Sequence, residues 1–246
     1  MISLAIPTHN RSDFVIESFV DVLNNPLIDD IVIVDDHSDV NIYLRLWNLI
    51  ESLKNDKIKL YRNDTNIKPL LNKAKAVSKC KNEWVILLDS DNIIDSKYVK
   101  SVSKLDVQAD TIYCPGMLYT IEKTFWCTFN DFDYVIDKDT AAEKIDDGMF
   151  ETLLNTGNYF VNREKYVDIV RFNNGEDIRL SSNDAMYFSY LWLLNGNKIM
   201  VVPDLPYTHR QHGGGIGGSW YANNVDDCLW ATDVLKDKIK RWKVNT

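Results

Sequence analysis

Cysteine and long apolar runs are both scarce in this sequence of 246 residues. The four cysteines are widely spaced and form no C-x-x-C pair: Cys80, Cys114, Cys127 and Cys228. We therefore expect reduced thiols and no cysteine-based zinc site. The N-terminal stretch MISLAIPTHNR lacks the basic segment of a signal peptide, and no run approaches the roughly 18–20 apolar residues of a membrane helix. These absences predict a cytoplasmic protein without a transmembrane segment.

The chain also has fewer basic residues than acidic residues. The chain has 28 Lys and Arg residues against 36 Asp and Glu residues, which gives a net charge of -8. A nucleic-acid-binding protein presents a basic face to the phosphate backbone, so we expect no nucleic-acid partner. An anionic small molecule would need a few local cations or a metal ion to receive it.

The first half of the chain alternates short apolar runs with amphipathic segments. We expect strands at 2–8, 30–36, 57–63 and 84–92, with helices at 13–24, 41–53 and 69–79 between them. This βαβ order is typical of an α/β fold, here a Rossmann-like one with a mostly parallel central sheet flanked by helices. In open sheets of this kind, ligands bind beyond the carboxyl ends of the strands.

The second half is more irregular. Its patterns predict strands at 111–120, 124–129, 158–162 and 198–203, and helices at 183–195 and 222–241. Because no linker interrupts the chain, we expect one domain over residues 1–246, divided into three parts: a nucleotide-binding half (about 1–110), an acceptor half (about 111–220) and a C-terminal helix (221–246). We expect that helix to pack on its own domain; the alternative is peripheral contact with a membrane or a partner.

Polar side chains follow three of the expected strands directly. They form the clusters Thr8-His9-Asn10, Asp35-Asp36 and Asp89-Ser90-Asp91, which the topology brings to one edge of the sheet. Close carboxylates such as Asp89 and Asp91 repel one another unless a cation lies between them, and their hard oxygens suit Mg²⁺ or Mn²⁺. The alternative for this cluster is a solvated turn.

The second cluster also has two interpretations. Asp36 is placed to accept a hydrogen bond from the N–H of a nucleotide base, whereas Asp35 fits a structural role better. The alternative is a turn in which Ser38 caps the next helix.

The stretch YTHRQHGGGIGGSWY holds five of the ten glycines. Gly213, Gly215 and Gly218 spell a dinucleotide fingerprint, but only 28 residues follow Gly218, too few for the βαβ unit that the fingerprint requires. His209 and His212 lack the further ligands of a structural zinc site. Two interpretations remain: a lid that closes over a ligand, and a flexible connector to the C-terminal helix.

Five motifs in order carry a resemblance to a known family. They are LAIPTHNR, IVIVDDHSD about thirty residues later, WVILLDSDN near residue 90, NTGNYFVNREKY with the following Asn183-Asp184, and HRQH before the glycine-rich loop. Together they resemble the GT-A fold glycosyltransferases, most of all the inverting family 2, over roughly residues 2–220. The resemblance implies transfer from a UDP-sugar to a hydroxyl of a glycan or other carbohydrate-bearing acceptor, with Mn²⁺ or Mg²⁺ as cofactor.

The resemblance assigns nucleotide-sugar binding to Pro7, Thr8, His9, Asn10, Asp36, Lys73, Asp89, Ser90 and Arg210. In this assignment Pro7, Thr8 and His9 lie along the base, and Asp36 holds the N3–H of uracil. Lys73 stands where the family usually has an arginine near the phosphates. The lysine ammonium is a single charged group, whereas an arginine guanidinium can donate two parallel hydrogen bonds to a phosphate. Lys68 stands where the family usually has glycine, a departure that bears on the geometry of this loop.

The resemblance also implies the metal site. Asp91 would ligate the ion and His212 would complete its shell, with His209 as the alternative ligand. Asp89 would touch the ribose or a metal-bound water, and is a further candidate ligand. The ion would act as a Lewis acid on the departing diphosphate.

Asp184 is the expected general base, which removes the proton of the attacking acceptor hydroxyl. The family writes two acids here, and this chain has Asn183 first, so one carboxylate remains. The alternative is a capping role, because Ser181-x-x-Asp184 fits a capping box. Gly157 and Asn158 are expected on the acceptor side.

The sequence therefore predicts a metal-dependent, inverting GT-A glycosyltransferase. Its rivals are a retaining transferase on the same fold, a nucleotidyltransferase on a similar sheet, and a catalytically inactive module that binds sugar nucleotides or glycans. The nucleotidyltransferase would need a basic, glycine-rich loop after the first strand, and PTHNRSD supplies none.

Overall fold

A computed structural model describes residues 1–120, 125–129, 135–172, 183–210 and 225–242. The first half of the chain forms these elements: β1 (Ile2–Thr8), α1 (Ser12–Phe19), η1 (Val20–Val22), β2 (Ile28–Asp35), α2 (Val40–Leu53), β3 (Ile58–Arg62), α3 (Pro69–Lys79), β4 (Trp84–Leu87) and α4 (Ser96–Val102). The second half forms β5 (Thr111–Tyr119), β6 (Phe125–Thr128), β7 (Val135–Ile136), α5 (Lys138–Lys144), α6 (Gly148–Leu154), β8 (Tyr159–Asn162), α7 (Arg163–Phe172), α8 (Asp184–Leu194), β9 (Lys198–Thr208) and α10 (Val225–Lys240).

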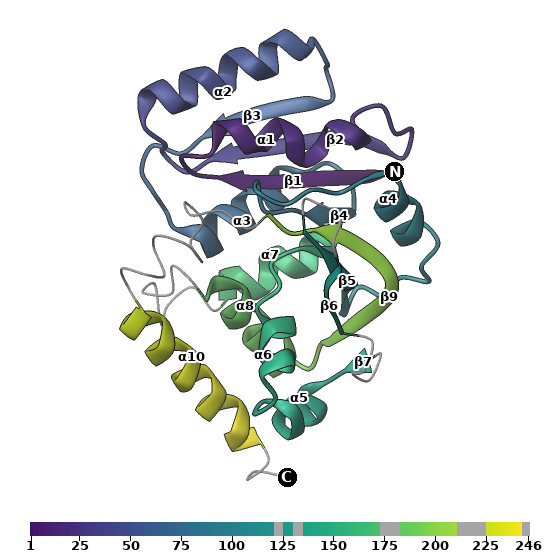
Figure 1. Ribbon diagram of the computed structural model, residues 1–246, viewed down its shortest axis with the longest axis vertical. Coiled ribbons are helices and arrows are strands. Elements are labelled where there is room, and N and C mark those ends of the chain that lie inside the picture. Colours follow the sequence, from purple (N-terminus) through teal and green to yellow (C-terminus); the bar gives the residue numbers. More distant parts are fainter. Residues whose placement is uncertain (121–124, 130–134, 173–182, 211–224, 243–246) are drawn as a thin grey trace.

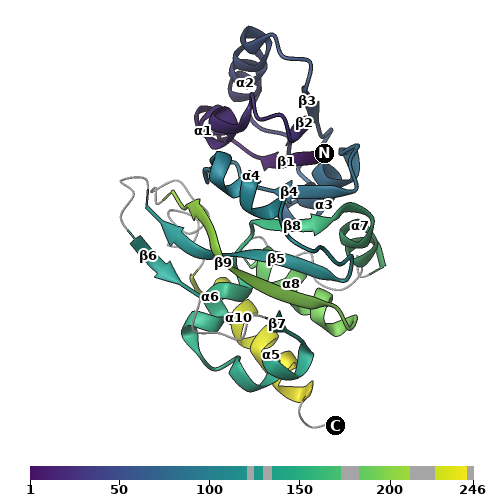
Figure 2. The same ribbon diagram turned by 90° about the vertical axis from the view of Figure 1, so that its right-hand side faces the viewer.

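One nine-stranded sheet runs through the molecule in the order β3-β2-β1-β4-β8-β5-β9-β7, with β6 paired to β5 (Figure 1). The expected α/β class with flanking helices is confirmed, but the sheet, expected to be mostly parallel, is mixed. The first four strands in this order are parallel, as are β5 and β9, whereas β6, β7 and β8 pair antiparallel. Figure 2 shows β4, β8, β5 and β9 following one another along the sheet.

Every element expected from the sequence is present. The helix at 69–79 has the expected bounds, and the strand expected at 84–92 ends at Leu87, where the chain turns into the loop of Asp89 and Asp91. The strands β1 and β2 are buried along nearly all their length, which explains their continuous Ile and Val content. The sequence patterns missed the short elements α4, α5, α6 and β7, and also α7.

The core of the second half is built around α8. Its residues are buried almost all round, so the helix shows no amphipathic face. Tyr166 stacks on Phe188 with ring centroids 4.2 Å apart, and Trp192 is fully buried beside Phe188. This aromatic packing fixes the start of α8, where Asp184 lies.

The C-terminal helix α10 packs on its own domain, as expected (Figure 1). Leu235 and Ile239 are buried, and Trp242 stacks on Tyr190 with ring centroids 5.5 Å apart. Two lysines of α10 form ion pairs within the chain, Lys236 with Glu151 and Lys240 with Asp146. Among the described helices, none combines the length and the apolar character needed to cross a membrane.

Candidate functional site

The three polar clusters meet at the carboxyl ends of β1, β2 and β4, as the topology predicts. The Asn10 backbone N–H donates to Ser38 Oγ at 2.7 Å, which joins the loop after β1 to the loop after β2. Arg11 Nη1 donates to Asp91 Oδ2 at 2.5 Å, which joins the loop after β1 to the loop after β4. One polar edge therefore carries most of the residues expected to bind the donor.

Asp36 organises the loop that leads into α3. Its Oδ1 accepts from Asn63 Nδ2 and from the Ile67 backbone N–H, both at 2.8 Å, and its Oδ2 accepts from the Lys68 backbone N–H at 3.0 Å. The carboxylate is buried, and the neighbouring His9 ring donates from Nδ1 to the Asp36 carbonyl at 2.9 Å. Asp36 is thus held rigidly beside His9, with one described donor on Oδ2.

The alternative in which Ser38 caps the next helix is wrong. Asp39 is the N-cap residue of α2, and its side chain makes no capping hydrogen bond. The Ser38 hydroxyl instead donates to Asp35, and Asp35 also accepts from the Ser38 backbone N–H at 3.1 Å. The structural role expected for Asp35 is consistent with these contacts and with its ion pair to Arg62, at 3.5 Å.

The remaining base-side residues lie where the chain leaves β1 and β4. Pro7 and Thr8 are the last residues of β1, and both are buried. The Thr8 hydroxyl is buried and has no hydrogen-bond partner among the described residues. Ser90 is also buried.

Lys73, Asp89 and Asp184 form a compact charged cluster from three elements. The Lys73 ammonium of α3 lies 3.0 Å from Asp89 Oδ1 and 2.8 Å from Asp184 Oδ2. The side chains of Lys73 and Asp184 are 8% and 9% exposed, and that of Asp89 is 27% exposed. The sequence placed Lys73 near the phosphates but did not predict its contact with Asp184.

The electrostatics of this cluster follow from its burial. Burial alone would lower the pKa of Lys73, but the carboxylates of Asp184 and Asp89 outweigh it and raise that pKa well above its usual value. Burial raises the pKa of Asp89, Lys73 lowers it, and the charges of Asp91 and Asp184 add to the rise. The cluster is therefore held together by one permanently charged ammonium.

Asp91 and Arg210 belong to a second charged group. Asp91 pairs with Arg11, a residue that the sequence analysis did not assign to the site. Arg210 Nε donates to the Asp91 carbonyl at 3.2 Å, while its Nη2 pairs with Glu17 and its guanidinium lies 4.5 Å from the Phe14 ring centroid. The Arg210 side chain, expected at the diphosphate, is thus directed toward α1.

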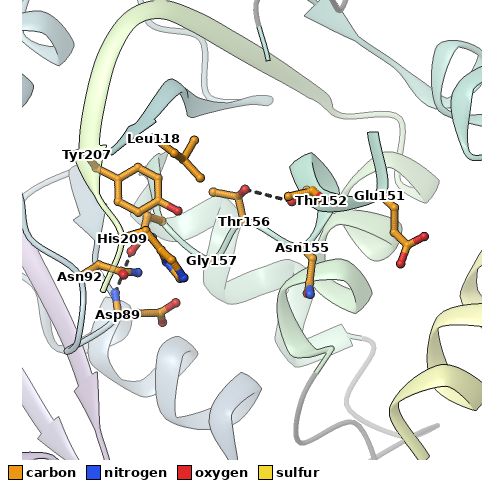
Figure 3. Close-up of a pocket in the computed structure, with 11 residues that line it drawn as sticks. Asp89, Asn92, Leu118, Glu151, Thr152, Asn155, Thr156, Gly157, Tyr207 and His209 are labelled. Carbon is orange, nitrogen blue, oxygen red and sulfur yellow. Dashed lines mark hydrogen bonds between the residues drawn. The ribbon is translucent and has the colours of Figure 1, made fainter. Parts of the chain in front are cut away.

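A pocket of about 290 Å³ opens beside the charged cluster (Figure 3). Its lining brings together four residues expected at the site: Asp89, Gly157, Asn158 and His209. Asn158 Oδ1 accepts from the Asp89 backbone N–H at 2.8 Å, which ties the start of β8 to the end of β4. The opposite wall comes from α6 and was not predicted; it carries Glu151, Thr152 and Asn155.

Gly157 lies against the charged cluster so closely that no side chain fits. An added Cβ would lie 2.5 Å from Asp89 Oδ2 and 2.8 Å from Lys73 Nζ. The sequence suggested only that glycine lets a substrate approach the backbone. The structure shows that it also makes room for the Lys73–Asp89 pair.

The capping box proposed as the alternative role of Asp184 is wrong. The N-cap residue of α8 is Asn183, without a side-chain cap, so Asp184 is the first helical residue rather than the third. Ser181 lies outside the described residues. Asn183 Nδ2 donates to Thr232 Oγ1 of α10 at 2.8 Å, which anchors the start of α8 to the C-terminal helix.

The side chains at this edge offer the types of ligand atom that a divalent cation prefers. Asp89 and Asp91 offer hard carboxylate oxygens, and His209 lines the same pocket as Asp89. Within the described part of the chain, no three His, Cys, Asp or Glu residues already converge on one point. His212 and the glycine-rich loop lie outside the described residues.

Comparison with known sequences gives one family and one curated relative. The model of glycosyl transferase family 2 matches residues 3–169. Glycosyltransferase GlyG of Streptococcus pneumoniae serotype 4 is 20% identical over 253 residues, which cover 96% of this chain and 77% of GlyG.

Comparison with solved structures shows the fold. S. aureus TarS 1–349 superposes with a TM-score of 0.65 at 17% identity, covering 99% of this chain and 70% of TarS, and the same fragment has been solved with UDP. GalNAc-T7 with UDP, GalNAc and Mn²⁺ superposes with a TM-score of 0.62 at 16% identity, covering 86% of this chain and 43% of that protein. The mannosyltransferase PcManGT from Pyrobaculum calidifontis, solved with GDP-Man and Mn²⁺, gives 0.53 at 12% identity, covering 85% and 56%.

Proposed function

Because this chain belongs to glycosyl transferase family 2 and is a GT-A fold glycosyltransferase, we propose that it transfers a sugar from a UDP-sugar to a hydroxyl of a glycan or other carbohydrate-bearing acceptor. We propose further that the reaction depends on Mn²⁺ or Mg²⁺ and inverts the anomeric carbon. The observation that carries this proposal is the buried cluster of Lys73, Asp89 and Asp184 beside a polar pocket.

The nucleotide would lie at the carboxyl ends of β1 and β2. Asp36 would accept the N3–H of uracil at Oδ2, which accepts one described hydrogen bond and keeps a lone pair. His9 and Asn10 flank this position, and the buried Thr8 hydroxyl offers a further polar contact. Rigid placement of these groups suits recognition of one base.

The diphosphate would lie between this edge and the pocket. Asp91 and Asp89 would hold the metal, with His209 or His212 as the further ligand. A bound ion supplies Lewis-acid stabilisation of the charge that builds on the departing diphosphate. Lys73 would contribute a cation from the protein itself.

The acceptor would enter the pocket between His209 and α6. Gly157 and Asn158 line it, and Thr152 and Asn155 can donate to and accept from sugar hydroxyls. Asp184 would take the proton of the attacking hydroxyl, a role that contributes typically 10²–10⁴-fold to the rate. Its place in the first turn of α8 aims the side chain rigidly.

The test is a panel of nucleotide sugars assayed for transfer and hydrolysis with Mn²⁺, with Mg²⁺, and with a chelator. We expect turnover of a UDP-sugar that stops in the chelator and falls at least about 100-fold in Asp91→Ala, because charge on the leaving group is no longer stabilised. The control is Asp56→Ala at an exposed turn residue, which should keep full activity.

The other outcomes separate the rival functions. Turnover that persists in the chelator would remove the metal from the proposal. A protein that binds UDP but turns over no nucleotide sugar in the panel is the inactive binding module. NMR of the product's anomeric configuration separates inverting from retaining transfer.

A further inference from the structure

We infer that Lys73 shields Asp184 in the donor-free protein and is drawn away by the donor diphosphate, so that donor and Asp184 compete for one ammonium group. Lys73 is then a positioning residue that couples donor binding to exposure of the base. The inference rests on the proposed function, in which a nucleoside diphosphate binds beside Asp89 and Asp184 acts on the acceptor.

The first observation is that one cation is shared by two carboxylates. Lys73 Nζ lies 3.0 Å from Asp89 Oδ1 and 2.8 Å from Asp184 Oδ2. The Asp184 oxygen is buried and accepts no aligned hydrogen bond from the described residues, so the ammonium is the group that balances its charge. If the Lys73 ammonium moves away, the Asp184 carboxylate becomes available to another hydrogen-bond donor.

The second observation is the place of the cluster beside the pocket. Asp89 and Gly157 line the pocket, and a Cβ added to Gly157 would lie 2.8 Å from Lys73 Nζ, so the ammonium is close to the lining. Asp184 is only 9% exposed and pairs with the same ammonium. An acceptor hydroxyl that approaches this Asp184 oxygen therefore has to replace Lys73 as its partner.

The third observation concerns charge. The Lys73 ammonium contacts two carboxylates, at 3.0 Å and 2.8 Å, and a cation shared in this way can exchange one anionic partner for another. A lysine suits such an exchange because it is a compact charge on a flexible stem, whereas an arginine fork would favour one fixed partner. A diphosphate adds negative charge next to Asp89, and it offers Lys73 new partners in a poorly solvated site where such contacts are strong.

The test is UDP affinity, measured by calorimetry with Mn²⁺ present. The Asp184→Asn variant removes the negative charge that competes with the diphosphate for Lys73. We therefore expect UDP to bind about tenfold more tightly than to the wild type, which is the size of one gained charge-assisted contact. In a Lys73→Met background, Asp184→Asn should change UDP affinity by less than about twofold, because the shared group is gone.

The matched control is Asp146→Asn. Asp146 pairs with Lys240 at an exposed site between α5 and α6, so this change removes the same charge from the protein away from the cluster. We expect UDP affinity to be unchanged. Equal tightening in both variants would overturn the inference, because it would reflect net charge alone.

A second measurement uses the wild-type protein and does not depend on the stability of any variant. Crystal structures with and without UDP and Mn²⁺ should show the distance between Lys73 Nζ and Asp184 Oδ2 growing from 2.8 Å to beyond the roughly 4 Å limit of an ion pair. An unchanged contact in the complex would overturn the inference.

Transfer activity is scored separately from these binding data. Asp184→Asn should lose transfer by at least about 100-fold, and persistent transfer would overturn the proposed base. UDP affinity that stays constant or falls in Asp184→Asn would overturn the competition and leave the proposed base standing.

Discussion

At the scale of single residues, Lys68 adopts a backbone conformation that side chains rarely take. Its φ is 75° and its ψ is 161°, a combination found almost only for glycine. The reason is local: the Lys68 backbone N–H donates to Asp36 Oδ2 and to Asn66 Oδ1, each at 3.0 Å. The loop therefore has a backbone conformation typical of glycine although residue 68 is a lysine, and the hydrogen bonds to Asp36 and Asn66 hold it there.

Lys68→Gly should stabilise the protein. We expect the free energy of unfolding to rise by about 1 kcal/mol, because relief of a strained φ outweighs the extra flexibility that glycine adds to the unfolded chain. Urea denaturation followed by circular dichroism measures the change. The control is Lys104→Gly, at an exposed turn residue without a positive φ, where stability should stay equal or fall slightly. A loss of stability in Lys68→Gly would show that the side chain has contacts that offset the strain.

Arg11 shows what residue patterns miss. It stands in the quoted motif LAIPTHNR, yet its partner Asp91 lies 80 positions away, and no local pattern points to that pair. The same holds for the contact of Lys73 with Asp184. Spacing along the chain indicates which residues reach the sheet edge, but it does not indicate which charged side chains form ion pairs there.

Among the helices, the short ones carry signals that apolar periodicity does not use. Three of them begin after an aspartate whose carboxylate accepts first-turn backbone N–H groups: Asp95 before α4, Asp137 before α5 and Asp147 before α6. Seven residues give too few apolar positions to establish a helical period. Capping residues, rather than hydrophobic spacing, were the available predictors here, and α6 forms a wall of the pocket.

The helix α10 packs on the rest of the domain, and a substitution at Leu235 can test whether this packing persists in solution. Leu235 is 2% exposed, so Leu235→Ala should lower the free energy of unfolding by about 2–4 kcal/mol through lost burial and the cavity left behind. The measurement is chemical denaturation at neutral pH. The matched control is Leu194→Ala at the end of α8, where the side chain is 43% exposed and the change should be below about 1 kcal/mol. Equal effects would mean that α10 leaves the domain in solution.

The peripheral membrane contact stays a prediction for this helix. The lysines Lys236 and Lys240 already pair with acidic residues of the chain, and Lys238 lies 5.7 Å from the ring centroid of Tyr190. A membrane would have to draw these cations away from their partners.

At the scale of the whole molecule, one sheet joins the two halves. The strand β4 pairs with β1 of the first half of the chain and with β8 of the second half. The charged cluster spans the same junction, since α3, the loop after β4 and α8 each supply one member. The single domain expected from the sequence stays a prediction, and it implies that the chain unfolds as one cooperative unit.

We therefore expect a single unfolding transition. Heating should give coincident curves for far-ultraviolet circular dichroism and tryptophan fluorescence, and UDP with Mn²⁺ should shift both midpoints upward together, because ligand that binds only the folded state stabilises the whole unit. Two separated transitions, or a shift of only one signal, would divide the chain into two domains.

Residue patterns alone were enough to predict the alternation of strands and helices, the α/β class, and the sheet edge where the acidic clusters lie. These follow from local periodicity and from the rule that parallel strands end at one edge, so they need no knowledge of distant contacts. The folded chain was needed to show that Lys73 lies between Asp89 and Asp184, that Arg11 pairs with Asp91, and that Lys68 has a backbone conformation typical of glycine. These contacts join residues that are far apart in the sequence. In a buried site, the position of each charged group decides which partner it has.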